Sequence, residues 1–256
     1  MKSIEYYEIE YQKFKNAPGF YLGYDCFQQE WYKITDLHLI GIIGAPGSGK
    51  TTFALNVACN IINQTNKLIK LYSLDKVGIF ITDALKKIDR PEINKIDIED
   101  KLLTVREIYD DFIKNADDYA CVIIDFLYKI KLGDIAMNTK ADRSIYETTN
   151  KQVQQIEAFQ KTIKKPVIVL IQPNREAGDG SDFPSMIQGE GSAKIEQTFL
   201  LLLSLCRPEK NPKLSEMNYS RWHNIIKIKA VKNSFGISDV EYELYFEPNT
   251  LRISNK

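Results

Sequence analysis

The strongest constraint on the fold of this chain is a short glycine-rich stretch. Residues 44–51 read GAPGSGKT and match the pattern G-x-x-x-x-G-K-[ST] at every fixed position. An apolar run, residues 37–43, precedes the stretch, and residues 50–64 follow it with apolar side chains at helical spacing. A strand, a glycine-rich turn and a helix in this order predict a P-loop, whose backbone N–H groups surround the phosphates of a nucleotide.

Each residue type in this stretch has a role in holding phosphates. Glycine permits the backbone turn that brings successive N–H groups onto the β-phosphate. Lys50 reaches the β- and γ-phosphate oxygens, and the hydroxyl of Thr51 binds Mg²⁺. The residues expected to hold the nucleotide are Gly44, Ala45, Pro46, Gly47, Ser48, Gly49, Lys50, Thr51 and Thr52. At average residue usage, a chance match occurs in roughly one chain in a hundred or fewer, so we interpret the stretch as a nucleotide site.

Apolar runs alternate with helical patterns along the rest of the chain. Strands are expected at residues 37–43, 68–74, 120–124, 166–171, 200–206 and 225–231, with a terminal hairpin at 242–246 and 250–253. Helices are expected at residues 50–64, 77–88, 102–115 and 143–164. Strands joined by helices predict an α/β fold with a mainly parallel central sheet, covered by helices on both faces.

Composition excludes several other classes of protein. Of the 256 residues, 44% are hydrophobic and 27% charged, so the chain is neither disordered nor collagen-like nor a coiled coil. Its 34 basic residues balance 34 acidic ones, so any nucleic-acid contact must come from local basic loops. The four cysteines are far apart and the two histidines isolated, which excludes a zinc knuckle or a disulfide framework.

The same composition favours a cytoplasmic protein. The first twenty residues lack the apolar segment of a signal peptide. The most apolar run, residues 199–206, is less than half as long as a membrane span. We therefore expect no membrane partner.

Asp125 is the expected second ligand of Mg²⁺. It ends the predicted strand at residues 120–124, and ligands of open α/β sheets bind at the carboxyl ends of the strands. The alternative interpretation is an aspartate that caps the next segment. A P-loop in the same chain favours the metal.

Further segments complete a resemblance to the RecA-like core of DnaB-type replicative helicases, with RadA and KaiC as related groups. Besides the P-loop, the segments that resemble the family, in the expected order, are GFYLGYDCFQQEWYKI, LYSLDK, VIIDFLYKI, PVIVLIQPNRE, EGSAKIEQTFLLLLSLCRPE and IKIKAVKNSFG. The resemblance covers nearly the whole chain. It implies an ATPase that uses ATP and Mg²⁺.

The resemblance implies catalytic roles beyond that of Lys50. Gln172 follows the fourth core strand, where the family has a γ-phosphate sensor; the alternative is a solvated loop side chain. Asp75 stands where the family has a glutamate as general base. An aspartate is one methylene shorter, and displacing a catalytic group by about 1 Å can cost roughly a hundredfold in rate. The alternative role for Asp75 is the N-cap of the helix near residue 77.

The family also supplies a basic finger to the neighbouring subunit's γ-phosphate. Where its arginine is expected, this chain has Ser234, so Lys232 is the candidate finger, although an ammonium lacks the bidentate fork of a guanidinium. Arg221 and Arg207 are other candidate donors. For Lys232, the alternative is a solvated turn residue.

Two long connections are the candidate DNA-binding loops. In the family, the loops after the third and fourth core strands hold single-stranded DNA in the channel of a ring. The corresponding basic residues here are Lys129, Lys131, Lys140 and Arg143 in the first loop and Arg175 and Lys194 in the second. The alternative is that both loops are merely solvated.

The resemblance also predicts a domain organisation and partners. Residues 31–256 would form the ATPase domain, and residues 1–30 an extension with an amphipathic stripe that docks on a neighbouring subunit or packs on its own core. The expected assembly is a homo-oligomer, a hexameric ring, with single-stranded DNA and replication-initiator, loader or primase proteins as partners.

Two functions remain open from the sequence. The first is an ATP-dependent DNA helicase or translocase, favoured by the segments SAKIEQ and IQPNR. The second is a RadA- or KaiC-like DNA-binding or regulatory ATPase without unwinding activity, favoured by Asp75 and Ser234.

Overall fold

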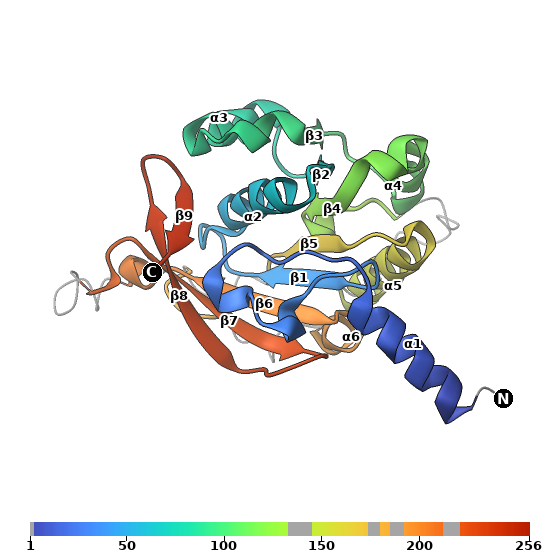
Figure 1. Cartoon of the computed structure of the whole chain (residues 1–256). Coiled ribbons are helices and arrows are strands. Elements are labelled where there is room, and N and C mark those ends of the chain that lie inside the picture. Colours follow the sequence, from blue (N-terminus) through green and yellow to red (C-terminus); the bar gives the residue numbers. More distant parts are fainter. Residues whose placement is uncertain (1–2, 133–144, 174–179, 185–191, 212–220) are drawn as a thin grey trace.

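A computed structural model describes residues 3–132, 145–173, 180–184, 192–211 and 221–256. Its strands are β1 Leu39–Ile43, β2 Leu68–Ser73, β3 Ile96–Glu99, β4 Tyr119–Asp125, β5 Val167–Ile171, β6 Leu201–Cys206, β7 Ile225–Asn233, β8 Val240–Glu247 and β9 Arg252–Asn255. They form one sheet in the order β3-β2-β4-β5-β1-β6-β7-β8-β9 (Figure 1). Strands β1 to β6 pair in parallel, and β7, β8 and β9 extend the sheet antiparallel.

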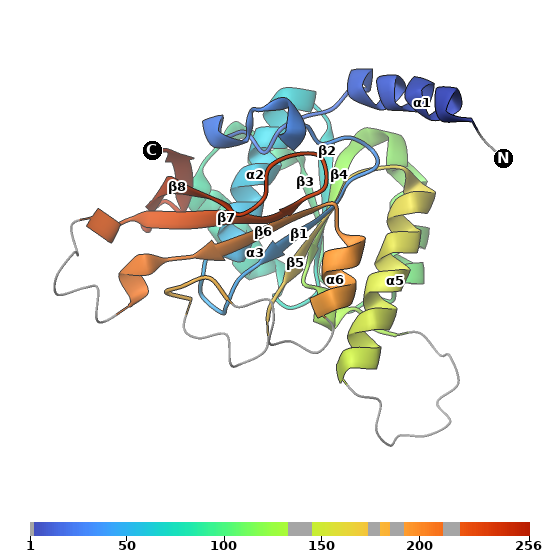
Figure 2. The same cartoon turned by 90° about the horizontal axis from the view of Figure 1, so that it is seen from below.

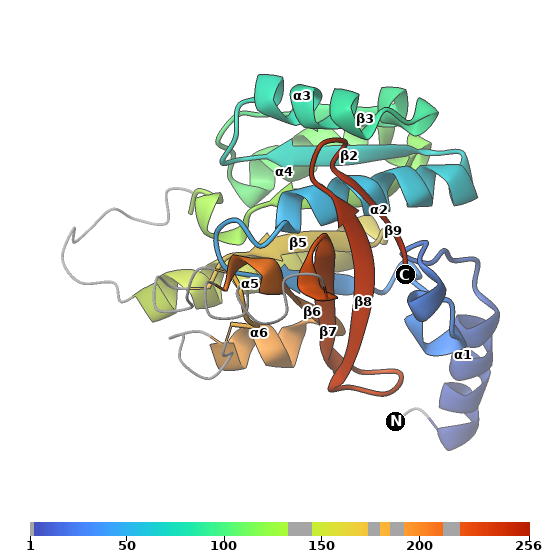
Figure 3. The same cartoon turned by 90° about the vertical axis from the view of Figure 1, so that its left-hand side faces the viewer.

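Helices cover both faces of this sheet. Their bounds are α1 Ile4–Asn16, α2 Lys50–Thr65, α3 Gly78–Ile88, α4 Val105–Phe112, α5 Ile145–Ile163 and α6 Ser192–Thr198. Helices α2 and α3 pack on one face and α4, α5 and α6 on the other, to the left and right of the strands in Figure 1. Figure 3 looks onto the first face and shows the β8–β9 hairpin beside α2.

Each central strand contributes to the hydrophobic cores on both faces. In β4, Cys121 and Ile123 pack with α2, whereas Val122 and Ile124 pack with α4 and α5. This alternation follows from the two-residue period of a strand. Every residue of β4 and β5 is buried, which explains why both strands read as unbroken apolar runs.

The N-terminal residues fall into two parts. Helix α1 projects from the body of the molecule with its N-terminal end outermost (Figures 1 and 2), and Ile4 on this helix is 79% exposed. The following segment is packed, because Phe20, Leu22 and Phe27 belong to the same core as α2. The hydrophobic core therefore begins at Phe20, upstream of the expected boundary after residue 30.

The predicted fold class is confirmed: a mainly parallel sheet lies between helices and ends in antiparallel strands. Two elements were not predicted. β3 is a short strand at the sheet edge and lies in a stretch rich in charge, whereas α6 follows a Gly- and Ser-rich segment that indicated only a loop. In the described parts of the chain, no helix is long and apolar enough to cross a membrane.

Candidate nucleotide-binding site

The glycine-rich stretch connects β1 to α2 at the carboxyl edge of the parallel strands. Its start lies beside β5, because the Gly44 N–H donates to the Ile171 carbonyl at 3.3 Å. Gly49 precedes α2 with φ +94°, a left-handed conformation that favours glycine. The chain leaves β1 through α2 toward β2, whereas it leaves the neighbouring β5 through α6 toward β6. The glycine-rich stretch thus lies where connections run in opposite directions along the sheet.

The Lys50 side chain is buried and folds back onto the P-loop. Its ammonium donates to the Gly44 carbonyl at 2.6 Å and to the Ala45 carbonyl at 3.0 Å. Burial lowers the pKa of Lys50 to about 8, and the carboxylate of Asp125 opposes this shift. Because two neutral carbonyls satisfy the charge only partly, an anion beside Lys50 would be strongly favoured.

Thr51 and Asp125, which we predicted as ligands of one metal ion, lie in direct contact. The Thr51 hydroxyl donates to Asp125 Oδ2 at 2.8 Å, and Asp125 is 4% exposed. Burial raises the pKa of Asp125, although the Thr51 hydroxyl and nearby ammonium groups favour its charged form. A hydroxyl and a carboxylate in contact fit Mg²⁺, which is usually held by one or two protein oxygens together with phosphate and water.

One further observation supports an anion at this site. Ser48 Oγ in the P-loop is buried, with no hydrogen-bond partner among the described residues. Within those residues, no group of three or more His, Cys, Asp or Glu side chains could hold a metal ion by itself. A metal at Thr51 and Asp125 therefore needs oxygens from a phosphate or from water.

Asp75 lies at the same sheet edge. Strand β2 pairs with β4 so that Ser73 lies opposite Asp125, and the Leu74 N–H donates to the Asp125 carbonyl at 2.6 Å. The Asp75 carboxylate is an exposed group that forms an ion pair with Lys129 at 3.2 Å.

The capping role considered for Asp75 is wrong. Helix α3 begins after Val77, which makes no side-chain cap, and the Gly78 N–H instead donates to Asp100 Oδ2 at 2.7 Å. Asp100 precedes α4 in the chain and approaches α3 only through the tertiary fold. The Asp75 carboxylate is therefore not used by the helix that follows it.

Two lysines near the P-loop were not predicted from the sequence. Lys76 and Lys210 both lie close enough to lower the pKa of Lys50 by charge repulsion. Lys210 ends a 3-10 helix, Pro208–Lys210, and its ammonium lies against Gly47, where a methyl group would collide with it. The available signal was their position close behind strands that end at this edge, because Lys76 lies three residues after β2 and Lys210 four residues after β6.

The remaining catalytic candidates occupy different places. Gln172 directly follows β5, whose last residue bonds the first residue of the P-loop, so it lies beside the nucleotide site. Lys232 is level with Leu202 near the start of β6, away from the P-loop of its own chain. Its ammonium donates to the Glu196 and Gln197 carbonyls at the end of α6. Lys232 is thus half-buried and ties β7 to α6, rather than being a solvated turn residue.

The two arginine candidates for the finger differ in accessibility. Arg207 is half-buried near the P-loop, where it forms an ion pair with Glu209 and lies 4.2 Å from the centroid of the Phe246 ring. Arg221 is exposed and lies over the Trp222 ring at 4.8 Å. Ser234, at the position of the family arginine, is exposed in the turn after β7.

The candidate DNA-binding residues are only partly described. Lys129 and Lys131 follow β4 and are exposed, and Lys194 lies on α6 rather than in a loop. Helix α6 packs on α5, which also contacts the segment of Lys129. Lys140, Arg143 and Arg175 lie outside the described residues.

Solved structures of known proteins share this fold. A DnaB-like replicative helicase, described together with its interactions with primase, matches with a TM-score of 0.79 and 21% identity over 100% of this chain and 67% of its own. A second solved structure, of a separate ATPase domain, matches with a TM-score of 0.75 and 18% identity over 100% of this chain and 99% of its own. No protein-family model matches the sequence, and no curated protein matches it. The chain has the fold of a DnaB-like, RecA-like helicase ATPase domain.

Proposed function

We propose that this chain is an ATP-dependent DNA translocase of the replicative helicase class. The supporting observation is that the P-loop, Asp75, Asp125 and Gln172 converge at one edge of the sheet, on strands that neighbour one another. Residues 31–256 would be the ATPase unit and residues 1–30 an extension of it. We place the protein in the cytoplasm.

The reaction we propose is hydrolysis of ATP to ADP and phosphate. Lys50 and the P-loop amides would hold the β- and γ-phosphates, and Thr51 and Asp125 would hold Mg²⁺. When bound, Mg²⁺ supplies positive charge to the phosphate oxygens. Asp75 would accept a proton from the attacking water, and Gln172 would report loss of the γ-phosphate to the following segment.

The assembly we propose is a homo-oligomeric ring around single-stranded DNA. Lys129, Lys131 and Lys194 would contact the phosphate backbone, together with Lys140, Arg143 and Arg175. Lys232 of one subunit is a candidate for the basic residue that reaches the γ-phosphate of the next subunit. Because Lys232 already contacts α6 of its own chain, exposed Arg221 is an equal candidate. The helicase with this fold has interactions with primase, so a primase is a candidate partner.

The test of this proposal is ATP turnover with and without single-stranded DNA. We expect turnover to rise when DNA is added, and Lys50→Ala to abolish it. Asp75→Asn should retain ATP binding and lose hydrolysis. Turnover that is independent of DNA would contradict the translocase, and full hydrolysis by Lys50→Ala would contradict the P-loop assignment.

The second candidate is a regulatory ATPase of the RadA or KaiC type. It is favoured by the ion pair that engages Asp75 with Lys129 and by the absence of an arginine at Ser234. Strand displacement on a forked DNA substrate separates the two functions. A translocase displaces the strand, whereas the regulatory ATPase binds DNA without displacing it.

A further inference from the structure

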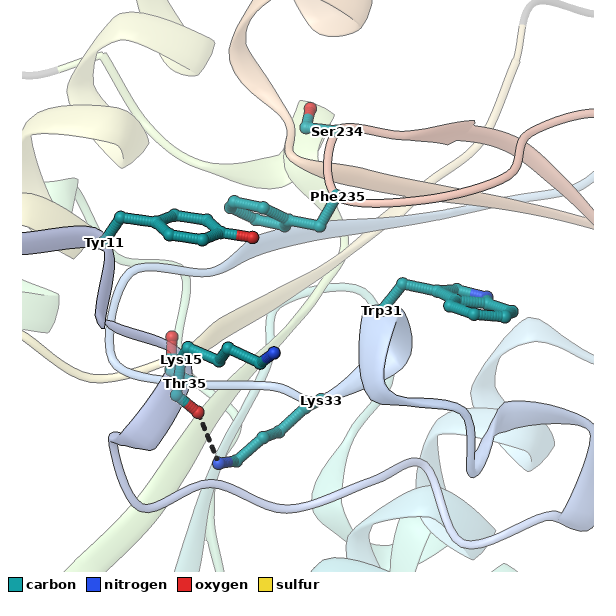
Figure 4. A pocket seen from close by; sticks show the side chains of 7 residues that line it. All are labelled: Tyr11, Lys15, Trp31, Lys33, Thr35, Ser234 and Phe235. Carbon is teal, nitrogen blue, oxygen red and sulfur yellow. Dashed lines mark hydrogen bonds between the residues drawn. The ribbon is translucent and has the colours of Figure 1, made fainter. Parts of the chain in front are cut away.

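A cavity lies at the opposite end of the molecule's parallel strands from the P-loop. It has a volume of about 330 Å³ and is bounded by α1, the segment before β1 and the turn after β7 (Figure 4). The turn after β7 lies at the amino end of β6, because the Ser234 N–H donates to the Leu200 carbonyl at 2.9 Å. The cavity is therefore separate from the candidate nucleotide site.

The lining of this cavity combines aromatic rings with positive charge. Tyr11, Trp31 and Phe235 supply rings, and Lys15 and Lys33 supply ammonium groups, as Figure 4 shows. The other two lining residues carry hydroxyl groups, so the side chains that the structure describes in this lining include no carboxylate. Rings that offer stacking faces beside ammonium groups suit a ligand that is planar at one end and anionic at the other.

Tertiary contacts hold the walls of the cavity in place. Trp31 is fixed from two sides: its carbonyl accepts from Asn233 Nδ2 at 3.2 Å, and its side chain packs so closely on Gly236 that a Cβ there would lie 2.5 Å from it. The ring of buried His38 lies tilted at 46° to the Phe235 ring with centroids 5.2 Å apart, and its Nδ1 accepts from the Thr35 N–H at 3.0 Å. Lys33 donates to the Lys15 carbonyl at 3.4 Å, which links the segment before β1 to the end of α1.

We propose that this cavity binds one nucleotide unit, with the base on the aromatic rings and the phosphate between Lys15 and Lys33. The volume is near the lower end of the range for small-ligand pockets, about 300 Å³, which suits a single unit. Two sources share this chemistry: a free mononucleotide, and one residue of a single strand. The proposal stands independently of ATP hydrolysis at the P-loop.

The fluorescence of Trp31 reports binding in the cavity. The chain has two tryptophans, so a Trp222→Phe background leaves Trp31 as the sole emitter. Titration with thymidine monophosphate and with a short oligothymidylate, both without ADP and in a Lys50→Ala version of this background that disables the P-loop, should quench this emission to a plateau. Phe235→Ala should weaken binding about tenfold, in line with the effect of removing one stacking ring.

Charge variants test the phosphate end of the ligand. Lys15→Ala and Lys33→Ala should each weaken the quenching titration about tenfold, whereas Lys87→Ala on α3, which pairs with Asp83, should leave it unchanged. Saturable quenching by the mononucleotide identifies a free mononucleotide as the ligand. Quenching by the oligonucleotide alone identifies a residue of a single-stranded nucleic acid as the ligand. The proposal would be overturned if neither ligand quenched the emission to a plateau. It would also be overturned if Lys15→Ala and Lys33→Ala bound the ligand as tightly as the parent protein.

Discussion

At the scale of single residues, the charge of Lys50 should control nucleotide affinity. In the free protein, burial has brought its pKa down to about 8, and bound phosphate would raise that value because it stabilises the ammonium form. Binding then requires uptake of a proton once the free lysine is neutral. Affinity for Mg·ATP should therefore be constant below about pH 7.5 and fall above pH 8, by at most about tenfold per pH unit.

Calorimetric titration between pH 6.5 and 9.5 measures this dependence. With Mg²⁺ in excess, Mg·ATP keeps its charge across this range, so the fall reports the protein. A Lys50→Arg variant is the matched control, because a guanidinium remains charged throughout. Wild-type affinity that stays flat up to pH 9.5 would contradict the assignment of the decline to Lys50.

The ion pair between Asp75 and Lys129 predicts a second effect. Lys129 engages the carboxylate that we assign as general base, and both side chains are partly solvated, so the pair is worth about 0.2–1 kcal/mol. Lys129→Ala should release Asp75 and raise turnover without DNA by about 1.4- to 5-fold, while reducing stimulation by DNA. Lys131→Ala, two residues further on, is the control. Unchanged or lower DNA-free turnover in Lys129→Ala would show that the pair does not restrain the base.

Lys210 predicts a third effect at this scale. Its ammonium rests against Gly47, so removing it should weaken binding of ADP and ATP about tenfold, as loss of a hydrogen bond to a charged group does. Lys229→Ala serves as the control, because Lys229 lies on β7 and pairs with Asp239, the residue before β8. Equal nucleotide affinity of Lys210→Ala and wild type, measured by calorimetry, would remove Lys210 from the site.

At the scale of elements, Asn56 joins α2 to the C-terminal hairpin. Its amide donates to the Thr52 and Leu251 carbonyls, each at 2.9 Å, and its carbonyl accepts from the Ile253 N–H at 3.1 Å. Asn56→Ala would leave buried backbone groups without partners, at a cost of about 1–3 kcal/mol for each group that water cannot reach. We expect a loss of about 2–4 kcal/mol in the free energy of unfolding.

Urea unfolding checks this expectation. Asn63→Ala, on the exposed face of the same helix, should change stability by no more than about 0.5 kcal/mol. If Asn56→Ala costs as little as Asn63→Ala, then the hairpin is not held to α2 by this side chain.

The sequence predicts long, strongly patterned elements and fails where tertiary contacts decide. Buried parallel strands such as β4 and β5 read as apolar runs, and the P-loop marks the start of α2. The cap of α3 is not predictable, because the group that performs it, Asp100, is distant in the chain and reaches Gly78 only in the folded state. Lys210 was missed for the same reason, since only packing brings it to Gly47.

The expected site residues also divide into those that local sequence predicts and those that tertiary contacts decide. The Thr51–Asp125 contact follows from motif and strand end, both local features. The partners of Lys232 and Asp75 follow from the register of β7 against β6 and from the path of the chain after β4, which no local pattern encodes.

At the scale of the whole molecule, α1 carries apolar side chains that its own chain leaves exposed. Ile9 is 53% exposed and Ile4 more so, and α1 points away from the body in two perpendicular views (Figures 1 and 2). Exposed apolar side chains on a projecting helix are typical of a contact with another chain. In the proposed ring, that chain is the neighbouring subunit.

This arrangement predicts that assembly and stability respond separately to changes in α1. An Ile4→Asp, Ile9→Asp double variant should remain as stable as wild type to heat, because neither side chain is buried in the monomer, yet it should lose its oligomeric state in Mg·ATP. Mass photometry and thermal unfolding measure the two properties, with Gln12→Ala as a control on the same helix. Since hydrolysis in the proposed ring needs a neighbour's basic residue, turnover should fall together with assembly. Retention of the full oligomer by the double variant would contradict a role of α1 in the contact between subunits.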